Sequence, residues 1–284
     1  MRVAYLGPPG TVSHEALRDS PIAARWEAVS VTTLYEAVMA VQSGNVARAL
    51  VPIENSVEGT VNPTLDTLAL DADSVIIIGE MVHTFELCLV ARAGIDAQEI
   101  ATVISHPQPL AQSARFLRRE LPQAETLSAT STSEAVRLVA ESDQPWAALG
   151  TSLAADLNGL VVLRRDIADQ DVNQTRFVWL APAGTKPDIK ATAGWKTSIV
   201  FWGDGDTVSG WLVGCLSEFG DRGVNLSMIE SRPRRSKLGH YMFFADLSGE
   251  ADDPAVADGL EALRQQTEMV RVLGSYPIHS YPST

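Results

Sequence analysis

The sequence predicts two domains, an α/β domain followed by a small domain with the ferredoxin-like order of elements. Residues 1–182 alternate short apolar runs with amphipathic ones, which is typical of strands alternating with helices. Residues 183–195 have the proline and glycine content of a linker. Residues 196–276 follow the order strand-helix-strand-strand-helix-strand, and residues 277–284 form a tail.

In the first domain, apolar runs predict a mostly parallel sheet, and proline or glycine marks two helix starts. Asn62 and Pro63 combine a capping residue with a first-turn proline. Residues 7–13 (GPPGTVS) form a glycine-rich turn whose N–H groups suit an anion, although a stiff connection is the simpler interpretation of this turn alone. The predicted strands are 2–6, 47–51, 75–82, 85–91, 101–104, 146–149 and 161–163. The predicted helices are 13–18, 34–42, 63–68, 109–120 and 133–141.

In the second domain, the same patterns predict four strands and two helices. The predicted strands are 197–202, 225–232, 241–247 and 270–273, and the predicted helices are 211–222 and 254–265.

Composition excludes several classes of function. The chain has 284 residues and a net charge of −13, so nucleic acid and anionic membranes are poor partners. Its start lacks the pattern of an export signal, and its apolar runs are too short to span a bilayer, which predicts a cytoplasmic protein. Cys88 and Cys215 lie in apolar segments and are expected to be buried thiols in a reducing compartment. No zinc-ligand spacing is present, and we expect no metal and no cofactor.

Polar residues gather at four places where predicted elements begin or end. They are residues 7–13, 52–60 (PIENSVEGT), 105–112 (SHPQPLAQ) and 173–177 (NQTRF). Together they supply hydroxyl and amide donors, one arginine and few ionisable groups. This set suits an organic anion held by hydrogen bonds better than serine-histidine acyl transfer or metal-assisted hydrolysis.

These segments resemble the motifs of the prephenate dehydratase family, in its bacterial monofunctional form. Residues 52–59 resemble the P-I-E-N-S-x-x-G motif, 105–108 the S-H-P-Q segment, and 173–177 the N-x-T-R-F motif. Residues 7–13 resemble the family's glycine-rich opening, and 229–233 (IESRP) resemble the ESRP signature of its C-terminal ACT domain. The five motifs occur in the family's order.

The resemblance implies an enzyme that converts prephenate to phenylpyruvate in phenylalanine biosynthesis, with loss of carbon dioxide and of the ring hydroxyl. It implies a two-lobed catalytic domain like a type-2 periplasmic binding protein, with one lobe of about 1–75 plus 160–180 and the other of 76–159. It also implies an ACT regulatory domain, paired with another copy in a homodimer or homotetramer.

The resemblance carries site roles onto matching residues. Thr175 is expected to be catalytic, aimed at the ring hydroxyl or at the departing carboxylate, and Arg176 to pair with a substrate carboxylate. Glu54 is expected to be a proton donor or an organiser of its loop. The expected substrate-binding residues are Thr11, Asn55, Ser56, Ser105, Gln112, Arg176 and Phe177. Packing for Thr175, a surface ion pair for Arg176 and a turn for Asn55 are the plain alternatives, and His106 is expected to be structural.

In the second domain the resemblance implies a phenylalanine site between paired ACT domains and feedback inhibition. The residues that match it are Gly210, Leu212, Asn225, Leu226, Glu230 and Ser231. Trp211 departs from the family's G-A-L motif. Its indole would fill the pocket if it pointed inward, and would cover a dimer surface if it pointed outward.

Three rival functions remain open at this point. Arogenate dehydration uses the same chemistry on a substrate whose amino group replaces the keto oxygen. A sensor without catalysis could retain the two-lobed fold, but the intact residues 175–177 argue against it. A secreted solute-binding protein is disfavoured by the start of the chain and by the ACT-like segment.

Overall fold

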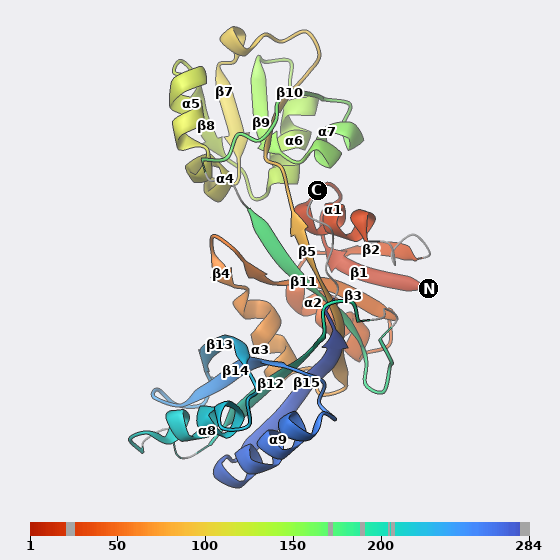
Figure 1. Cartoon of the computed structure of the whole chain (residues 1–284). Coiled ribbons are helices and arrows are strands. Elements are labelled where there is room, and N and C mark those ends of the chain that lie inside the picture. The colour runs from red at the N-terminus through yellow and green to blue at the C-terminus, as the bar shows by residue number, and fades with distance from the viewer. Residues whose placement is uncertain (21–25, 170–172, 188–190, 204, 206–207, 279–284) are drawn as a thin grey trace. The chain divides into compact units, whose positions relative to one another are not determined.

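The computed structural model describes residues 1–20, 26–169, 173–187, 191–203, 205 and 208–278. Parts of the predicted linker (188–190) and tail (279–284) lie outside the described residues. The chain divides into two compact units, and Figure 1 gives the labels of their elements. Unit 1 comprises Met1–Ala37, Glu54–Gly59 and His83–Thr175, and unit 2 comprises Val38–Ile53, Thr60–Val82 and Arg176–Thr284.

The strands before the linker are β1 (Arg2–Leu6), β2 (Glu27–Val31), β3 (Arg48–Asn55), β4 (Gly59–Thr60), β5 (Val75–Thr84), β6 (Cys88–Ala91), β7 (Thr102–Ser105), β8 (Glu125–Ser128), β9 (Trp146–Gly150), β10 (Val161–Arg164) and β11 (Gln174–Pro182). The helices are α1 (Val12–Asp19), α2 (Leu34–Gln42), α3 (Asn62–Leu70), α4 (Pro107–Gln112), α5 (Ala114–Glu120), α6 (Thr132–Glu141) and α7 (Ser152–Leu157).

These strands form two sheets, which confirms the predicted α/β class. The first has the order β2-β1-β3-β11-β5 with β4 paired to β3, and the second has the order β10-β6-β9-β7-β8. The chain passes to the second sheet after β5 and returns after β10, as the expected two-lobed organisation requires. The strand assignments differ from the predicted lobe limits, because β5 belongs to the first sheet and β10 to the second.

The second sheet lies in unit 1 and is apolar on both faces. Leu87, Leu89 and Leu149 pack in a cluster with Leu117 of α5. Their sequence neighbours Cys88, Val90 and Ala148 pack in another cluster with residues of α6 and α7, such as Val136 and Ala154. Successive strand residues point to opposite faces, so continuous apolar runs are what a sheet covered on both faces needs.

Four short elements, β2, β4, β8 and α7, were not predicted from the sequence, the strand β11 was given no bounds, and one predicted helix is broken. β2 and β8 contain few buried residues, so neither carries a strong apolar pattern. α7 has only six residues, about the shortest run that a helical pattern can reveal. The helix expected at 109–120 is divided at Ser113 into α4 and α5.

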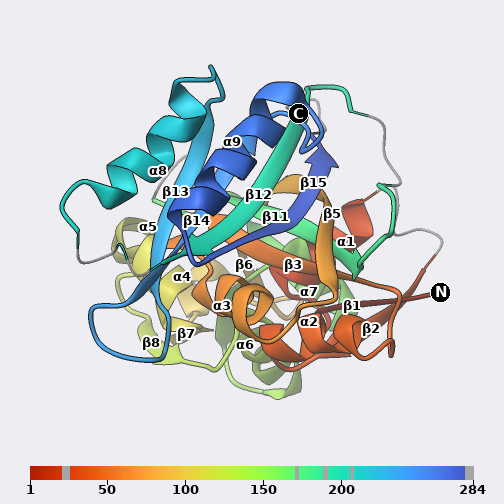
Figure 2. The same ribbon diagram turned by 90° about the horizontal axis from the view of Figure 1, so that it is seen from below.

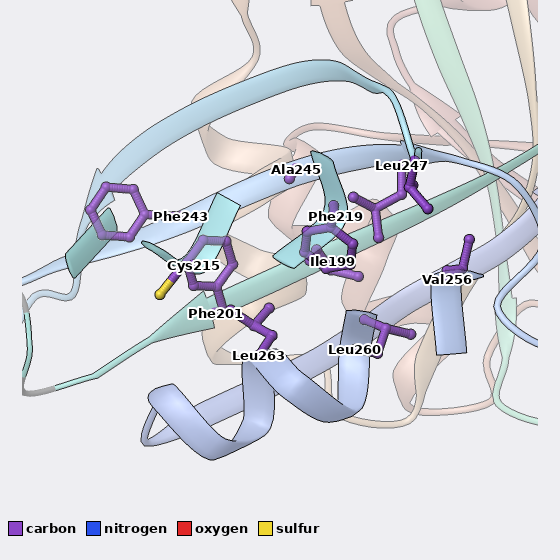
Figure 3. Packing of buried hydrophobic residues seen from close by; sticks show 11 residues of the cluster. Ile199, Phe201, Cys215, Phe219, Phe243, Ala245, Leu247, Val256, Leu260 and Leu263 are labelled. Atoms are coloured by element: carbon purple, nitrogen blue, oxygen red, sulfur yellow. The ribbon is translucent and has the colours of Figure 1, made fainter. Parts of the chain in front are cut away.

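The small C-terminal sheet lies in unit 2 and has the predicted ferredoxin-like order. Its elements are β12 (Trp195–Trp202), α8 (Trp211–Gly220), β13 (Leu226–Pro233), β14 (Tyr241–Ser248), α9 (Pro254–Gln266) and β15 (Met269–Pro277). The strand order is β13-β14-β12-β15, and α8 and α9 cover one face of this sheet (Figure 2). Phe201, Phe219, Phe243 and Leu263 are central to the core between the helices and the sheet (Figure 3).

Within unit 2 this sheet also packs against the segment from α3 to β5. A Cβ built on Gly274 of β15 would lie 2.1 Å from the main-chain oxygen of Ile77, so only glycine fits there. Arg271 of β15 donates to the main-chain oxygens of Leu68, Ala72 and Val75. The two regions therefore meet through close backbone contact as well as through side chains.

Two further sequence-based expectations concern the thiols and membrane spans. Cys88 and Cys215 are free and buried, as predicted. None of the helices in the described part of the chain is long and apolar enough to cross a membrane.

Candidate active site and effector site

Four uncharged polar side chains of unit 1 form one hydrogen-bonded group, which we call the amide cluster. Asn55 Nδ2 donates to Thr175 Oγ1 at 2.9 Å and to Asn173 Oδ1 at 3.1 Å. Asn173 Nδ2 donates to Gln112 Oε1 at 3.4 Å. The end of β3, the end of α4 and the start of β11 supply these residues. The fold thus brings together three of the predicted site residues, Asn55, Gln112 and Thr175, although they are far apart in sequence.

The side chain of Asn55 is held in one orientation by the turn after β3. Its Oδ1 accepts hydrogen bonds from the N–H groups of Val57 and Glu58 at 2.9 and 3.1 Å. Asparagine is favoured in such turns because its side chain replaces a main-chain acceptor. The amide N–H is thereby directed to the oxygen of Thr175, so that the Thr175 hydroxyl acts as acceptor in this bond.

Two groups of the amide cluster retain hydrogen-bonding capacity that the protein does not use. No described residue accepts the hydroxyl hydrogen of Thr175, whose exposed fraction is only 7%. Gln112 Nε2 is buried and has no hydrogen-bond partner among the described residues. An unpaired buried donor costs about 1–3 kcal/mol, so its persistence is typical of a site where a ligand supplies the acceptor.

The residues on either side of Asn55 have different surroundings. Ser56 Oγ accepts from the N–H of Gln174 at 3.0 Å, and Ser56 N–H donates to the Gln174 carbonyl at 2.8 Å. Ser56 therefore joins the turn after β3 to the start of β11, which supports the position of Thr175. Glu54 is half-buried at the next-to-last position of β3.

Two predicted substrate-binding hydroxyls are used by the protein itself. Ser105 has an exposed fraction of 0%, and its hydroxyl donates to the Leu149 carbonyl at 2.8 Å, which joins β7 to β9. Thr11 caps α1, since its hydroxyl accepts from His14 N at 3.3 Å and donates to the Leu6 carbonyl at 2.9 Å. Ser105 thus has a structural hydrogen bond between strands and Thr11 caps a helix, and their predicted contacts with substrate stay predictions.

Arg176 and Phe177 are not placed as expected from the sequence. The Arg176 guanidinium lies 3.1 Å from Glu80 Oε2 and 2.8 Å from Asp246 Oδ2, in the interior of unit 2. Phe177 has an exposed fraction of 1% and is part of the core. Arg176 is thus paired with protein carboxylates and Phe177 is packed among protein atoms, and their predicted contacts with substrate stay predictions.

The glycine-rich turn lines a cavity of about 710 Å³ in unit 1. Gly10 packs so closely on α7 that a Cβ would lie 3.0 Å from Ala154, and its carbonyl accepts from the Thr151 hydroxyl at 2.9 Å. Ser133 Oγ, in the first turn of α6, is buried without a hydrogen-bond partner in the described part of the chain. The other residues that line the cavity include Thr32, Ser131, Glu134, Arg137 and Asn158.

The predicted effector residues lie at the start of α8 and on β13. Gly210 precedes α8 with a φ of 83°, a conformation that favours glycine. Leu212 and Leu226 pack against the core of their own domain. The remaining residues are Asn225 and Ser231, which are exposed, and Glu230, whose Oε2 accepts from Thr60 Oγ1 at 3.2 Å.

The indole of Trp211 packs against its own domain. Its ring lies 6.3 Å from that of Phe201 and 6.0 Å from that of Phe243, and its Nε1 donates to the Gln266 carbonyl at 2.9 Å. A Cβ on Gly205 would lie 2.1 Å from the indole, so the glycine makes room for it. The tryptophan at this position is therefore accommodated by α9 and by the loop after β12.

Asn173 belongs to the amide cluster, although the sequence had indicated only its motif and no role. It lies two residues before Thr175, and residues two apart in extended chain point to the same side. The two-residue repeat of an extended chain was therefore the feature of the sequence that could have identified Asn173 as a member of the cluster.

Two family models match this chain, one in each of its two predicted domains. The family model for prephenate dehydratase matches residues 3–185, and the model for the ACT domain matches residues 216–265. A prephenate dehydratase of Mycolicibacterium vanbaalenii is 38% identical over 288 residues, covering 97% of this chain and 90% of the relative.

Two solved structures are similar along nearly the whole chain. The prephenate dehydratase of Arthrobacter aurescens in complex with L-Phe has a TM-score of 0.88 and 37% identity, covering 98% of this chain and 90% of the other. GqqA, described as a novel type of quorum quenching acylase, has a TM-score of 0.87 and 27% identity, covering 98% of both chains.

Proposed function

The chain belongs to the prephenate dehydratase family, and we propose that its amide cluster is where prephenate is dehydrated and decarboxylated. The activity is that of a hydro-lyase, which forms phenylpyruvate. The observation that carries the proposed site is the 2.9 Å bond from Asn55 Nδ2 to Thr175 Oγ1. It orients the Thr175 hydroxyl so that its hydrogen is available to a substrate oxygen.

The reaction breaks two bonds that join substituents to the ring, and the ring itself stays intact. The bond to the ring carboxylate breaks and its electron pair enters the ring, while the C–O bond of the 4-hydroxyl breaks and the ring becomes aromatic. The hydroxyl takes up one proton and leaves as water. Thr175 donates a hydrogen bond to the leaving oxygen, and general acid assistance of this kind contributes roughly 10²–10⁴-fold.

The other residues have supporting roles in this proposal. Gln112 Nε2 donates to a substrate oxygen, which satisfies an otherwise unpaired buried group. Asn55 and Asn173 hold Thr175 and Gln112 in position, and Ser56 holds β11 against the turn. Glu54, which directly precedes Asn55 in β3, is proposed either to supply the proton or to organise the turn after β3.

Turnover of prephenate by the wild-type chain and by Thr175→Ala tests this site. We expect the substitution to lower kcat by about 10²–10⁴-fold, with an unchanged melting temperature and with partial activity in Thr175→Ser. Equal turnover by Thr175→Ala and wild type would remove Thr175 from the mechanism. Arogenate assayed in parallel decides between the two substrates.

An acylase activity is the second possibility, because of the similarity to GqqA. The amide cluster contains no ionisable group that would activate a nucleophile for amide hydrolysis. Hydrolysis of an N-acyl amide without phenylpyruvate formation from prephenate would favour that activity over dehydration.

We further propose that L-phenylalanine regulates the enzyme at the ACT domain of one copy against that of another. The relative from Arthrobacter aurescens was solved with L-Phe, and β13, which carries Glu230, is an edge strand of its sheet. An edge strand presents main-chain groups that a second chain can pair with. Mass measurement in solution with and without phenylalanine tests the proposed homodimer or homotetramer.

We propose a cytoplasmic location. Support comes from the biosynthetic activity of the family and from the two buried free thiols, which suit a reducing compartment. Fractionation of cells that express the full chain tests this.

A further inference from the structure

A second polar group, which we call the ion network, begins at Arg176. The Arg176 guanidinium lies 3.1 Å from Glu80 Oε2 and 2.8 Å from Asp246 Oδ2. Lys196 Nζ donates to both oxygens of Glu80, at 3.0 and 2.8 Å. The exposed fractions of these four side chains are between 1% and 12%. Two cations and two carboxylates thus balance each other in the interior of unit 2.

The ion network continues through neutral hydroxyls. Ser198 Oγ donates to Asp246 Oδ1 at 2.5 Å, and the hydroxyls of Ser198 and Tyr276 lie 2.8 Å apart. Burial, with the negative charges of Asp246 and Glu80, holds the pKa of Tyr276 well above its usual range, so the phenol remains protonated. Asp246 is therefore held by partners on β11, on β12 and, through Ser198, on β15.

The position of Arg176 in the chain links this network to the proposed catalysis. Arg176 directly follows Thr175 in β11, and neighbouring strand residues point to opposite faces. The backbone that orients Thr175 toward Asn55 is thus the backbone that Arg176 anchors. A displacement of about 1 Å at a catalytic group is enough to lower a rate by about 10²-fold.

Asp246 is also a direct neighbour of the predicted effector strand. In the pairing of β13 with β14, Met228 lies opposite Asp246 and Glu230 lies opposite Phe244. A movement of β13 would therefore act first on β14, the strand whose Asp246 pairs with the Arg176 guanidinium. The connection from β13 to Arg176 thus consists of the pairing of β13 with β14 and of the buried ion pair between Asp246 and Arg176.

We infer that Arg176 is a positioning residue for Thr175, and that the ACT sheet, through Asp246, sets the catalytic rate by holding Arg176. The inference rests on the proposed function, because it requires Thr175 to act on the substrate. It separates Arg176 from substrate recognition and assigns Asp246 a role in regulation. The buried carboxylate of Asp246 is thereby explained as the ion-pair partner of the arginine that follows Thr175.

The decisive variant is the double substitution Arg176→Gln with Asp246→Asn. It removes one cation and one carboxylate, so the remaining Glu80–Lys196 pair stays balanced and no buried charge is left without a partner. Asparagine retains an oxygen for Ser198. The matched control is Arg271→Gln, which removes another contact between the ACT sheet and the α3–β5 segment without touching β11.

Steady-state kinetics, melting temperature and phenylalanine inhibition are measured for wild type, double variant and control. We expect kcat of the folded double variant to fall by about 10²-fold with little change in KM, and its residual rate to be insensitive to phenylalanine. Arg176→Lys, which keeps the charge, should recover part of kcat. The control should retain the wild-type kcat even if its melting temperature is lower.

Three outcomes would overturn the inference. A large rise in KM at unchanged kcat would mean that Arg176 binds substrate. A wild-type kcat in the double variant would mean that the ion network only stabilises the fold. An equal loss of kcat in Arg271→Gln would mean that any loosened contact is sufficient. Failure of the proposed function is distinguishable, because the wild-type chain itself would then form no phenylpyruvate.

Discussion

Thr175 and Arg176 are adjacent in β11, yet they belong to two polar groups with opposite properties. The amide cluster around Thr175 is uncharged and leaves two donors without acceptors, the Thr175 hydroxyl and Gln112 Nε2. The ion network around Arg176 is charged and balanced, with every carboxylate facing a cation. The comparison teaches that two unused donors within one uncharged group suit a ligand, whereas opposite buried charges in balance suit a place that holds the fold.

The largest expected effect on stability comes from unbalancing the ion network. Asp246→Asn alone leaves Arg176 and Lys196 facing only Glu80, and we expect it to lower the free energy of unfolding by about 3–5 kcal/mol. Chemical denaturation followed by fluorescence measures this. A loss no larger than that of an exposed pair such as Arg137–Glu141 would mean that the network does not stabilise the fold.

In the amide cluster the expected effect on rate exceeds the loss of stability that the missing hydrogen bonds of Asn55 cause. Asn55→Ala should lower kcat by about 10²-fold, because the Thr175 hydroxyl loses the donor that orients it. The double variant with Thr175→Ala should be no slower than Thr175→Ala alone, since the two residues act as a unit. If the losses of kcat in the two single variants add up in the double variant, Asn55 acts on the substrate independently of Thr175.

Gln112→Met is expected to have contrasting effects on binding and on stability. The substitution removes a buried donor that has no partner, Nε2, but also the Oε1 acceptor of Asn173 Nδ2. The two effects oppose each other, so the free energy of unfolding should change by less than about 1 kcal/mol. KM for prephenate should rise, because a substrate oxygen loses its donor. A clear loss of stability at unchanged KM would instead make Gln112 a structural residue.

Another ion pair, between Asp66 of α3 and Arg232 of β13, gives a prediction on pH. Burial favours the protonated carboxyl, but hydrogen bonds from Arg232 and Arg235 outweigh it and hold the pKa of Asp66 below its usual range. The pair therefore stabilises the fold above about pH 4, the unfolded value, and the contribution is lost as pH falls through the lower folded pKa. The difference in unfolding free energy between wild type and Asp66→Asn should be largest near neutral pH and shrink below pH 4. A constant difference from neutral to acid pH would contradict the assignment.

The smallest effect is expected at the two thiols. Burial raises the pKa of Cys88 to about 12 and that of Cys215 to about 11, so both remain protonated near neutral pH. Iodoacetamide at pH 8 should leave the native chain unmodified and label two cysteines after denaturation, as measured by mass spectrometry. Rapid labelling of the native chain would show that the core around Cys88 or the core around Cys215 opens in solution.

Sequence patterns were sufficient for the long elements and for the motifs. The apolar runs at β5, β6 and β9 and the order of the C-terminal elements were predicted because burial on one or both faces leaves a period in the sequence. The edge strands β2 and β8 were missed because their exposed residues leave no such period. Within the motifs, the roles of Ser105 and Phe177 were expected from resemblance, and the sequence did not reveal that both side chains are buried.

The sequence by itself determined the class of fold, the order of the two domains and the family, because these depend on local periodicity and on short motifs in a fixed order. Only the tertiary structure decided which polar residues share a hydrogen bond. Asn55 meets Thr175 across a separation of 120 residues, and Arg176 of β11 forms an ion pair with Asp246, which lies in another sheet. A side chain's role depends on the partners that folding brings to it, and a linear motif lists the side chains without those partners.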